Sequence, residues 1–452
     1  MDSIYQKIKT NLDKLKIKNC SILIALSGGM DSMALLFLLI ILKSQFKLKL
    51  YAAYVNHNLR NKESKKEEKF IIDITEKLSI PLYKYSVPIS FWKELKNQSI
   101  EMAARKIRYK FFYEILNLNK INYIATAHNF NDKIETFFLH LFRGSGLDSL
   151  RSIPIKNKKI IRPLLTITRK QIENYIISQN IPYFHDYSND QNIYKRNIIR
   201  NKLLPVFKKI HPNFEKSFSH VFQIINEESI FLNKLTIIYL KKILIYKTDY
   251  LFCLNKTKYS KFPRVIQKNI IKIILKKIKY PALPNNILLN TLSGRKNNYL
   301  YYNNNLISKN CKNYLWFINQ KKLKTFNENI TVNKIPFKYE NNDISISLNK
   351  TSNINPKKSL CFRYDNSSFP LLIRGFDPED KILINNKNTK SIKKILNEKG
   401  IPELIHKKVI VIETNNKKII GFMTYNFNRI SKEFYINDKK NSISADIFFV
   451  NT

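Results

Sequence analysis

A short segment near the beginning of the chain combines two glycines with small polar side chains and one acid, reading SGGMDS over residues 27–32. Glycine lets the backbone approach a ligand closely, and the N–H groups at a helix start favour a phosphate group. Asp31 would repel a phosphate alone, but it suits a Mg²⁺ ion that bridges phosphate oxygens. The segment matches neither of the two common glycine-rich nucleotide motifs. It therefore predicts a nucleotide-phosphate site of another kind, formed by Ser27, Gly28, Gly29, Met30, Asp31 and Ser32.

A second group of residues has the chemistry to act on an amine. His128, Asp132 and Glu135 are spaced i, i+4 and i+7, so a helix that begins by His128 would place them on one face. Two carboxylates together can bind an ammonium group and assist the loss of its proton before nucleophilic attack. The structural alternative is the ordinary charged face of an amphipathic helix.

Basic side chains form two further groups. Arg105 and Arg108 lie three residues apart on a predicted helix, where they either neutralise phosphate charge or form ordinary surface ion pairs. A later basic run contains Arg196, Arg200 and Lys202. We expect these three side chains to contact the phosphates of a bound polyanion, because such contacts position a nucleic acid without reading its sequence.

The chain around these residues alternates strand and helix signals. Apolar runs predict strands at 21–26, 48–55, 82–87 and 123–127, and helices are predicted at 31–43, 62–78, 99–116 and 131–142. This alternation is typical of a parallel sheet covered by helices on both faces. Right-handed crossovers would bring the carboxyl ends of the strands to one edge of that sheet. We therefore predict an α/β fold with a Rossmann-like catalytic domain whose functional residues meet at this edge.

The net charge of the chain bears on its partner. The sequence has 79 Lys and Arg against 34 Asp and Glu, which gives a formal net charge of +45. Such a surplus favours RNA, DNA or an acidic membrane as partner, although an AT-rich gene also enriches lysine. The longest uncharged apolar run, residues 33–42, has about half of the ~20 residues that a membrane-spanning helix needs. We therefore expect no membrane-spanning helix. An acidic membrane surface is not the default partner either, because the motifs favour an RNA, so we expect no membrane partner.

Cysteine usage and the first residues indicate the compartment. The four cysteines are far apart and form no CxxC pair, which argues against a zinc ribbon, a redox dithiol and a secreted disulfide scaffold. Residues 1–10 contain no apolar signal-peptide core. The expected location is cytoplasmic.

Further segments accompany the predicted strands in a fixed order. They read VNHNLR at 55–60, IEMAARKIRY at 100–109, TAHNFNDKIET at 126–136, LFRGSG at 141–146 and RPLL at 162–165. Together with SGGMDS they resemble the tRNA(Ile)-lysidine synthase family of the N-type ATP pyrophosphatase (PP-loop) superfamily. The resemblance is dense over residues 20–215 and resumes near 380–413, where SIKKILNEKGIPELIHKKVIVI is similar to that family's carboxyl-terminal domain.

The resemblance implies a ligase reaction on tRNA(Ile) with a CAU anticodon. ATP adenylates O2 of the wobble cytidine, and the ε-amine of free lysine then attacks C2 and displaces AMP, which forms lysidine and changes decoding from AUG to AUA. ATP and Mg²⁺ are the implied cofactors. The implied roles are catalysis by Asp31, Arg105, Asp132 and Glu135, ATP binding by residues 27–32, lysine binding by His128, Asp132 and Glu135, tRNA contact by Arg196, Arg200 and Lys202, and Mg²⁺ binding by Asp31.

The sequence departs from the family pattern at two positions. Asn129 and Asn131 stand where the family usually shows a second histidine and a doubled aspartate. Asp132 is then the sole carboxylate of that pair, and metal binding at this motif is in doubt.

Other classes remain as alternatives. The runner-up is a PP-loop tRNA thiolase, although no suitable cysteine pair is present. A non-enzymatic RNA-binding protein is disfavoured by the intact SGGMDS segment, and an amidotransferase-type synthetase by the lack of a glutaminase-like portion.

The predicted domains correspond to the changes in composition. We expect a PP-loop catalytic domain at 1–215, a mainly helical tRNA-binding domain at 216–320, a linker or irregular segment at 321–358, and a small α+β tRNA-binding domain at 359–452. The sequence leaves the oligomeric state, including a homodimer, open.

Overall fold

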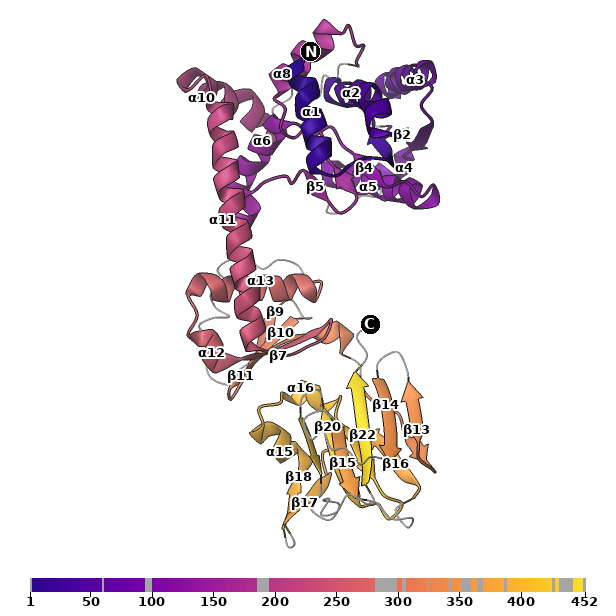
Figure 1. Ribbon diagram of the computed structural model, residues 1–452, viewed down its shortest axis with the longest axis vertical. Coiled ribbons are helices and arrows are strands. Elements are labelled where there is room, and N and C mark those ends of the chain that lie inside the picture. Colours follow the sequence, from indigo (N-terminus) through magenta and orange to yellow (C-terminus); the bar gives the residue numbers. More distant parts are fainter. Residues whose placement is uncertain are drawn as a thin grey trace. The chain divides into compact units, whose positions relative to one another are not determined.

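The computed structural model (Figure 1) describes residues 2–58, 61–93, 100–184, 195–280, 299–302, 306–323, 325–340, 344–350, 359–363, 369–385, 388–424, 427–430 and 442–449. The chain forms two compact units, Met1–Ile230 and Phe231–Thr452. Within the described ranges, no helix has the length and apolar character that a membrane span requires.

A six-stranded sheet forms the centre of the first unit (Figure 1). Its strand β1 is apolar on both sides, with Ile22 and Ile24 buried in one cluster and Leu23 in another. The order is β3-β2-β1-β4-β6-β5, and every neighbouring pair is parallel except β5 with β6. The predicted parallel sheet is confirmed. The strands are β1 (Cys20–Ala25), β2 (Leu48–Asn56), β3 (Leu82–Ser86), β4 (Tyr123–Ala125), β5 (Lys156–Asn157) and β6 (Ile160–Ile161).

Helices cover both faces of this sheet. Apolar residues of α1, α2, α3 and α8 pack with Ile22 and Ile24, whereas α5 packs with Leu23 through Phe111 and Phe112. The two faces of one strand are thus buried by different helices, as an α/β layer structure requires. The helices are α1 (Asp2–Lys14), α2 (Met30–Phe46), α3 (Asn61–Lys77), α4 (Ile89–Lys93), α5 (Ile100–Leu118), α6 (Phe130–Leu141), α7 (Leu147–Leu150) and α8 (Arg169–Ser178).

An aromatic cluster joins α6 to the helices after residue 194. Phe130 and Phe138 of α6 pack with Phe214 and Phe222, and the Phe138 and Phe207 rings are stacked with centroids 5.3 Å apart. This packing places the basic segment beside α6. The elements are α9 (Lys195–Ile198), the π-helix η2 (Ile199–Leu203), α10 (Leu204–Ile210) and α11 (Phe214–Ile243).

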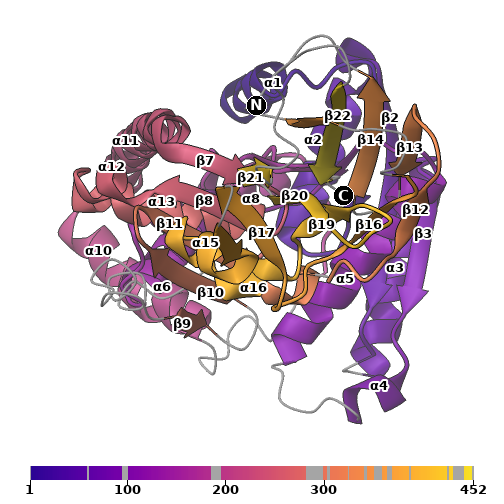
Figure 2. The same ribbon diagram turned by 90° about the horizontal axis from the view of Figure 1, so that it is seen from below.

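In the second unit, an antiparallel sheet separates two apolar layers. One cluster combines its strands with Ile270 and Ile274 of α13, which Figure 2 shows beside β8 and β11. The other combines Trp316 with Ile395 of α15, and Trp316 Nε1 donates to the Gly400 carbonyl at 3.0 Å. The sheet order is β7-β8-β11-β10-β9. The elements are β7 (Leu244–Lys247), β8 (Leu251–Asn255), β9 (Tyr299–Tyr302), β10 (Leu306–Cys311), β11 (Tyr314–Asn319), α12 (Lys256–Ser260), α13 (Arg264–Lys277), α15 (Ile392–Glu398) and α16 (Glu403–His406).

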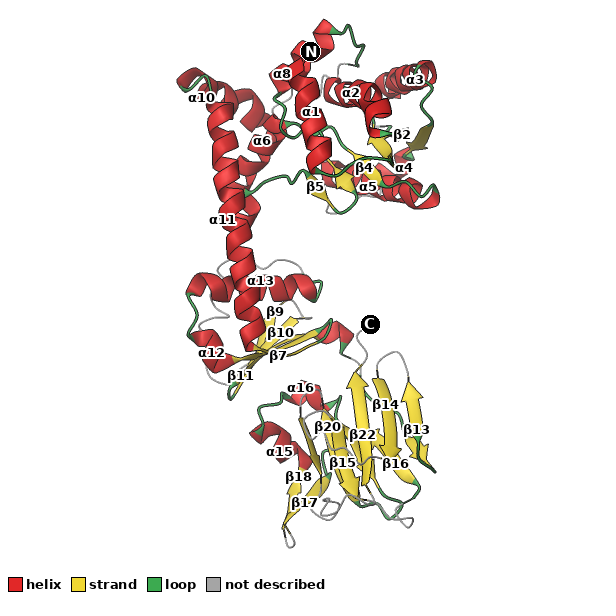
Figure 3. Ribbon diagram, in the orientation of Figure 1, coloured by secondary structure: helices red, strands yellow, loops and turns green. Residues whose placement is uncertain are grey.

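Two further antiparallel sheets share a core near the carboxyl end (Figure 3). Ile373 and Ile412 from one sheet pack with Leu348 and Phe362 from the other. Their orders are β12-β16-β19-β20-β21 and β13-β14-β22-β15, and β17 pairs with β18. The strands are β12 (Ile330–Val332), β13 (Phe337–Glu340), β14 (Ile344–Lys350), β15 (Ser359–Arg363), β16 (Leu371–Gly375), β17 (Lys381–Asn385), β18 (Asn388–Ser391), β19 (Ile410–Glu413), β20 (Ile419–Thr424), β21 (Phe427–Ile430) and β22 (Ser442–Phe449).

The structure differs from the predicted domains in two places. The region 216–320, expected to be mainly helical, also carries the strands β7–β11, and it shares a core with α15 and α16. The region 321–358, expected to be a linker or irregular, contains β12, β13 and β14 with Val332, Ile346 and Leu348 buried. These strands are short, and their polar faces carry Thr, Lys, Glu, Ser and Asn within a segment rich in polar residues, so composition hides the alternation that marks them.

Candidate active site

The SGGMDS segment forms a tight loop between β1 and α2. Gly28 has a φ of +70°, a conformation that side chains rarely adopt, and Gly29 is the N-cap of α2. The buried Ser32 hydroxyl donates to the Gly29 carbonyl at 2.8 Å and accepts from the Ser27 backbone N–H and hydroxyl. Ser32 therefore shapes the loop from within. The first-turn amides of α2 remain the natural phosphate donors.

Asp31 lies in the first turn of α2, and one of its oxygens accepts from Asn129 Nδ2 at 3.1 Å. Burial, followed by the neighbouring Asp132 carboxylate, raises the pKa of Asp31 to about 6. A buried acid with this environment fits a cation close to it. Among the described residues no three His, Cys, Asp or Glu side chains gather into a metal-binding group.

The segment after β4 holds a second part of the site. Helix α6 begins at Phe130 with Asn129 as its N-cap, so it does not begin by His128, and His128 lies outside the helical face of Asp132 and Glu135. Asn129 Oδ1 accepts from the Asp132 N–H at 3.0 Å, and Asp132 Oδ2 accepts from the Asn129 N–H at 2.9 Å. This is a capping box, and asparagine is among the residues best suited to the N-cap position.

His128 is held as a neutral imidazole. Its Nδ1 lies 2.9 Å from the Thr126 hydroxyl. Burial, followed by the charges of Arg162 and Arg196, lowers the pKa of His128 to about 3. An imidazole with so low a pKa is a poor proton acceptor for an ammonium group at neutral pH. We therefore expect it to act as a hydrogen-bonding group rather than as a base.

Two arginines enclose the carboxylates of α6. Arg196 contacts Glu135 at 2.6 Å and Asp132 at 2.9 Å, and Arg200 contacts Glu135 at 2.6 Å and Asp132 at 3.3 Å. Glu135 is fully buried. Two of the three residues predicted to bind lysine thus pair with two of those predicted to contact tRNA, because α9 and η2 pack beside α6. Lys202 is exposed, as a phosphate contact requires.

Other basic side chains lie near this group. Arg105 is exposed on α5, with its guanidinium 4.9 Å from the centroid of the Tyr109 ring. Arg162, which comes directly after β6, is 4% exposed and donates to the Pro154 carbonyl at 2.7 Å. The charges of both arginines act on His128. The sequence predicts a role for Arg105 but none for Arg162, although Arg162 begins the RPLL segment and follows a parallel strand.

His57 occupies the corresponding position after β2. Its ring packs edge-on against Trp92, with the centroids 5.9 Å apart. Burial, followed by the charge of Arg108, lowers the pKa of His57 to about 4. Both of its ring nitrogens are buried and lack a hydrogen-bond partner among the described residues. A ligand that reaches this part of the edge would meet them.

The functional side chains therefore come from one edge of the sheet. Residues 27–32 come after β1, His128 and Asn129 after β4, and Arg162 after β6, which are neighbouring strands in the order β1-β4-β6. Carboxyl ends of parallel strands meet in this way at the ligand-binding edge of open α/β sheets. The candidate residues of these three strands thus lie at one edge, and their part in the chemistry stays a prediction.

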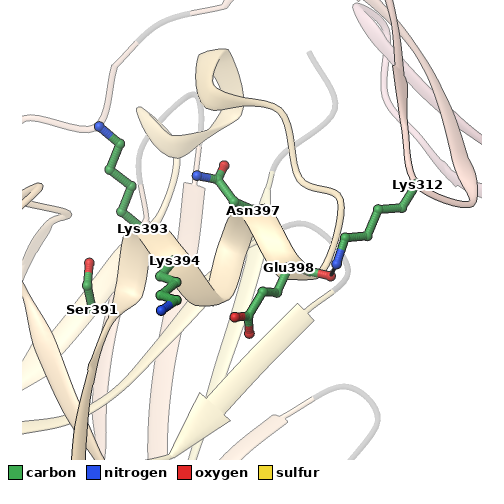
Figure 4. Close-up of a pocket in the computed structure, with 6 residues that line it drawn as sticks. All are labelled: Lys312, Ser391, Lys393, Lys394, Asn397 and Glu398. Carbon is green, nitrogen blue, oxygen red and sulfur yellow. Dashed lines mark hydrogen bonds between the residues drawn. The ribbon is translucent and has the colours of Figure 1, made fainter. Parts of the chain in front are cut away.

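A separate basic pocket lies within the second unit (Figure 4). It has a volume of about 470 Å³. Lys312 donates to the Glu398 carbonyl, and Lys390 pairs with the Glu398 carboxylate at 2.6 Å. Lysine surfaces of this kind contact phosphates without selecting a sequence. The pocket is lined by Lys312, Ser391, Lys393, Lys394, Asn397 and Glu398.

Comparisons with known proteins show what this chain is similar to. A family model described as a PP-loop domain matches residues 2–207. A tRNA(Ile)-lysidine synthase from Thermosipho africanus is 41% identical over 200 residues, which span 44% of this chain and 47% of that protein. The alignment thus covers about half of that relative. A U34-tRNA thiolase structure from Methanococcus maripaludis has a TM-score of 0.43 and 19% identity, and covers 50% of this chain and 78% of that one.

A longer match extends into the second unit. A tRNA(Ile)-lysidine synthase from Borreliella burgdorferi is 32% identical over 373 residues, which cover 77% of this chain and 82% of that protein. A match over 77% of this chain is longer than the first unit, so it includes residues of both units. The chain therefore belongs to the tRNA(Ile)-lysidine synthase family.

Proposed function

We propose that this protein ligates free lysine to C2 of the wobble cytidine in CAU-anticodon tRNA(Ile), using ATP and forming lysidine, AMP and pyrophosphate. The observation that supports the proposal is the continuous hydrogen-bond network from Asp31 through Asn129 to Asp132, which connects the phosphate loop with the first turn of α6. Family membership supplies the reaction class. A tRNA substrate is met in the cytoplasm, which is the location we propose.

The first step requires positioning and charge neutralisation. Cytidine O2 attacks the α-phosphorus, and pyrophosphate leaves, so the protein has to hold the phosphates in line. The amides of Gly29 and Met30 at the start of α2 suit the departing phosphates, and Asp31 is the residue that would hold Mg²⁺. When bound, the ion neutralises charge on the phosphate oxygens. Arg105 and Arg162, whose charges act on the neighbouring His128, are the candidates for stabilising further negative charge.

The second step requires a neutral lysine amine. The ε-amine attacks C2, AMP leaves, and a proton is lost from nitrogen. Asp132 is the carboxylate available for this role because it is partly exposed, whereas Glu135 is fully buried beneath both guanidiniums. The positive charges of two arginines balance the negative charges of the two carboxylates in this structure. Both guanidiniums donate to the same oxygen, Asp132 Oδ1. We therefore propose that an RNA phosphate draws one of them away, and that the lysine ammonium takes its place at this oxygen.

The thiolase alternative finds no support in the position of the cysteines. Cys20, the described cysteine of the first unit, is the first residue of β1, at the opposite end of that strand from the loop. Within the described part of the first unit, no cysteine side chain therefore lies at the edge where the phosphate loop is found. Sulfur transfer would need a thiolate at that edge.

Product formation tests the proposal. The protein is incubated with ATP, Mg²⁺, labelled lysine and the CAU-anticodon tRNA, and label retained in the RNA is counted. We expect incorporation that depends on ATP, and none into the same tRNA with its wobble cytidine replaced by guanosine. Absence of incorporation, together with a mass gain when sulfide replaces lysine, would favour thiolation.

A further inference from the structure

Asn129 makes hydrogen bonds to both halves of the site. We propose that Asn129 is a positioning residue whose side-chain amide holds the Asp31 carboxylate in the orientation that binds Mg²⁺ and ATP. The inference rests on the proposed ATP site. It concerns a position at which this sequence departs from the family pattern, so it is specific to the contacts of this chain.

The orientation of the amide is fixed by its partners. Asn129 is 1% exposed, and its Oδ1 accepts from the Asp132 N–H at 3.0 Å. Because the oxygen is used there, the NH₂ end faces Asp31, and it donates to Asp31 Oδ1 at 3.1 Å. A flipped amide would place an oxygen against a carboxylate and an NH₂ group against an N–H, so both contacts would be lost.

The backbone around Asn129 is anchored on further sides. The Phe130 N–H donates to the Ile167 carbonyl at 2.8 Å, and Asn131 Oδ1 accepts from the Arg169 N–H at 2.9 Å. The amide is therefore held in place before any ligand arrives. A hydrogen bond from a fixed donor restricts the carboxylate without the entropy cost that a mobile surface side chain would pay.

The competing explanation is that Asn129 serves only to cap α6. Serine is also a good N-cap, but its shorter side chain does not extend to Asp31. Asn129→Ser should therefore preserve the helix start and remove the contact with Asp31. Asn129→Asp also preserves the cap, but it replaces the donor with a carboxylate that faces Asp31.

Asn255 provides a matched control. It is the N-cap of α12 in the second unit, and its side chain accepts from the Lys258 N–H at 2.9 Å. Asn255→Ser changes the same kind of cap in a helix outside the PP-loop domain. It is expected to leave ATP binding unchanged.

The test measures binding of a non-hydrolysable ATP analogue by calorimetry over a series of Mg²⁺ concentrations, with the melting temperature of each variant recorded. For Asn129→Ser we expect about tenfold weaker binding of the analogue, the amount that one hydrogen bond to a charged group supports. The Mg²⁺ midpoint should move to higher concentration, and the KM for lysine should not change. For Asn129→Asp we expect a larger loss of analogue binding.

Two results would overturn the proposal. One is wild-type analogue affinity in Asn129→Ser. The other is a loss that Asn255→Ser reproduces, because a general effect of cap replacement would then explain it. If the wild-type protein binds the analogue but makes no lysidine, the proposed function fails, and the titration still decides the role of Asn129.

Discussion

Arginine–carboxylate clusters lie in both units, and they differ in charge balance and in the elements that hold them. In the first unit, Arg196 and Arg200 face Asp132 and Glu135 across helices. In the second unit, Arg374 contacts both Asp380, at 2.8 Å, and Glu413, at 2.7 Å. Arg374 and Glu413 stand on the paired strands β16 and β19.

The strand cluster, which consists of Arg374, Asp380 and Glu413, is held in one arrangement by further hydrogen bonds. Arg374 also donates to the Gly375 carbonyl, and Asp380 accepts from the Asp377 N–H. Hydrogen bonds from Arg374 to Asp380 and Glu413 hold the pKa of Arg374 above its usual range. The helix cluster consists of Arg196, Arg200, Asp132 and Glu135. Its Arg200 stands on η2, a π-helix, and such segments often occur at functional sites. We infer from this difference that the strand cluster stabilises the fold and that the helix cluster exchanges partners with substrate.

The largest expected effect is the loss of pyrophosphate release when Asp31 of the phosphate loop is replaced. Asp31→Ala should lower ATP-dependent pyrophosphate release by about 10³-fold or more, because it removes the carboxylate that would hold the metal. The free energy of unfolding should not fall, since the cost of burying this acid disappears. Pyrophosphate release and urea unfolding measure the two effects. Near-normal release would remove Asp31 from the mechanism.

Glu135→Ala should affect both stability and activity. The substitution leaves two guanidiniums without their buried partner and should reduce the free energy of unfolding by about 3 kcal/mol. The folded fraction should also lose lysine transfer, because Arg196 and Arg200 would no longer be positioned. Urea unfolding and lysine incorporation test this. A stable variant with normal transfer would contradict the role given to the helix cluster.

Arg374→Met removes the central residue of the strand cluster, as Glu135→Ala removes the buried residue of the helix cluster. It leaves Asp380 and Glu413 unpaired and should also lower the free energy of unfolding by about 3 kcal/mol. Lysidine formation per folded molecule at saturating tRNA should stay at the wild-type level. A variant of normal stability that fails in catalysis would reverse the distinction between the two clusters.

A smaller effect concerns acid stability near the helix cluster. The pKa of His128, about 3, lies below its ordinary value of 6.5, so the unfolded chain takes up this proton first as the pH falls. Stability from this group is therefore present above pH 6.5 and is lost between 6.5 and 3. Relative to His128→Gln, the wild type should lose up to about 1.4 kcal/mol per pH unit within that window. Unfolding curves at pH 6 to 4 measure the difference, and parallel curves would argue against a neutral buried imidazole.

Local patterns predicted most of the first unit because each strand and helix carries its own apolar signal. The helix expected at 131–142 is α6, and the loop at 27–32 lies where its glycines indicate. Contacts between distant segments left no such signal. The bond from Asn129 to Asp31 joins residues 98 positions apart, and the pairing of Arg196 with Glu135 depends on packing between helices. Arginines that look like surface phosphate contacts in the sequence are therefore partly buried in the structure.

The most direct test of the account separates the two chemical steps at Asp132. Asp132→Asn keeps a side-chain oxygen for the Asn129 N–H but loses the charge that we assign to lysine. The tRNA is incubated with this variant, ATP, Mg²⁺ and lysine, and its wobble nucleoside is identified by mass spectrometry. We expect adenylated cytidine to accumulate and lysidine to be absent or strongly reduced. Lysidine formed at the wild-type rate, with an unchanged KM for lysine, would contradict the account.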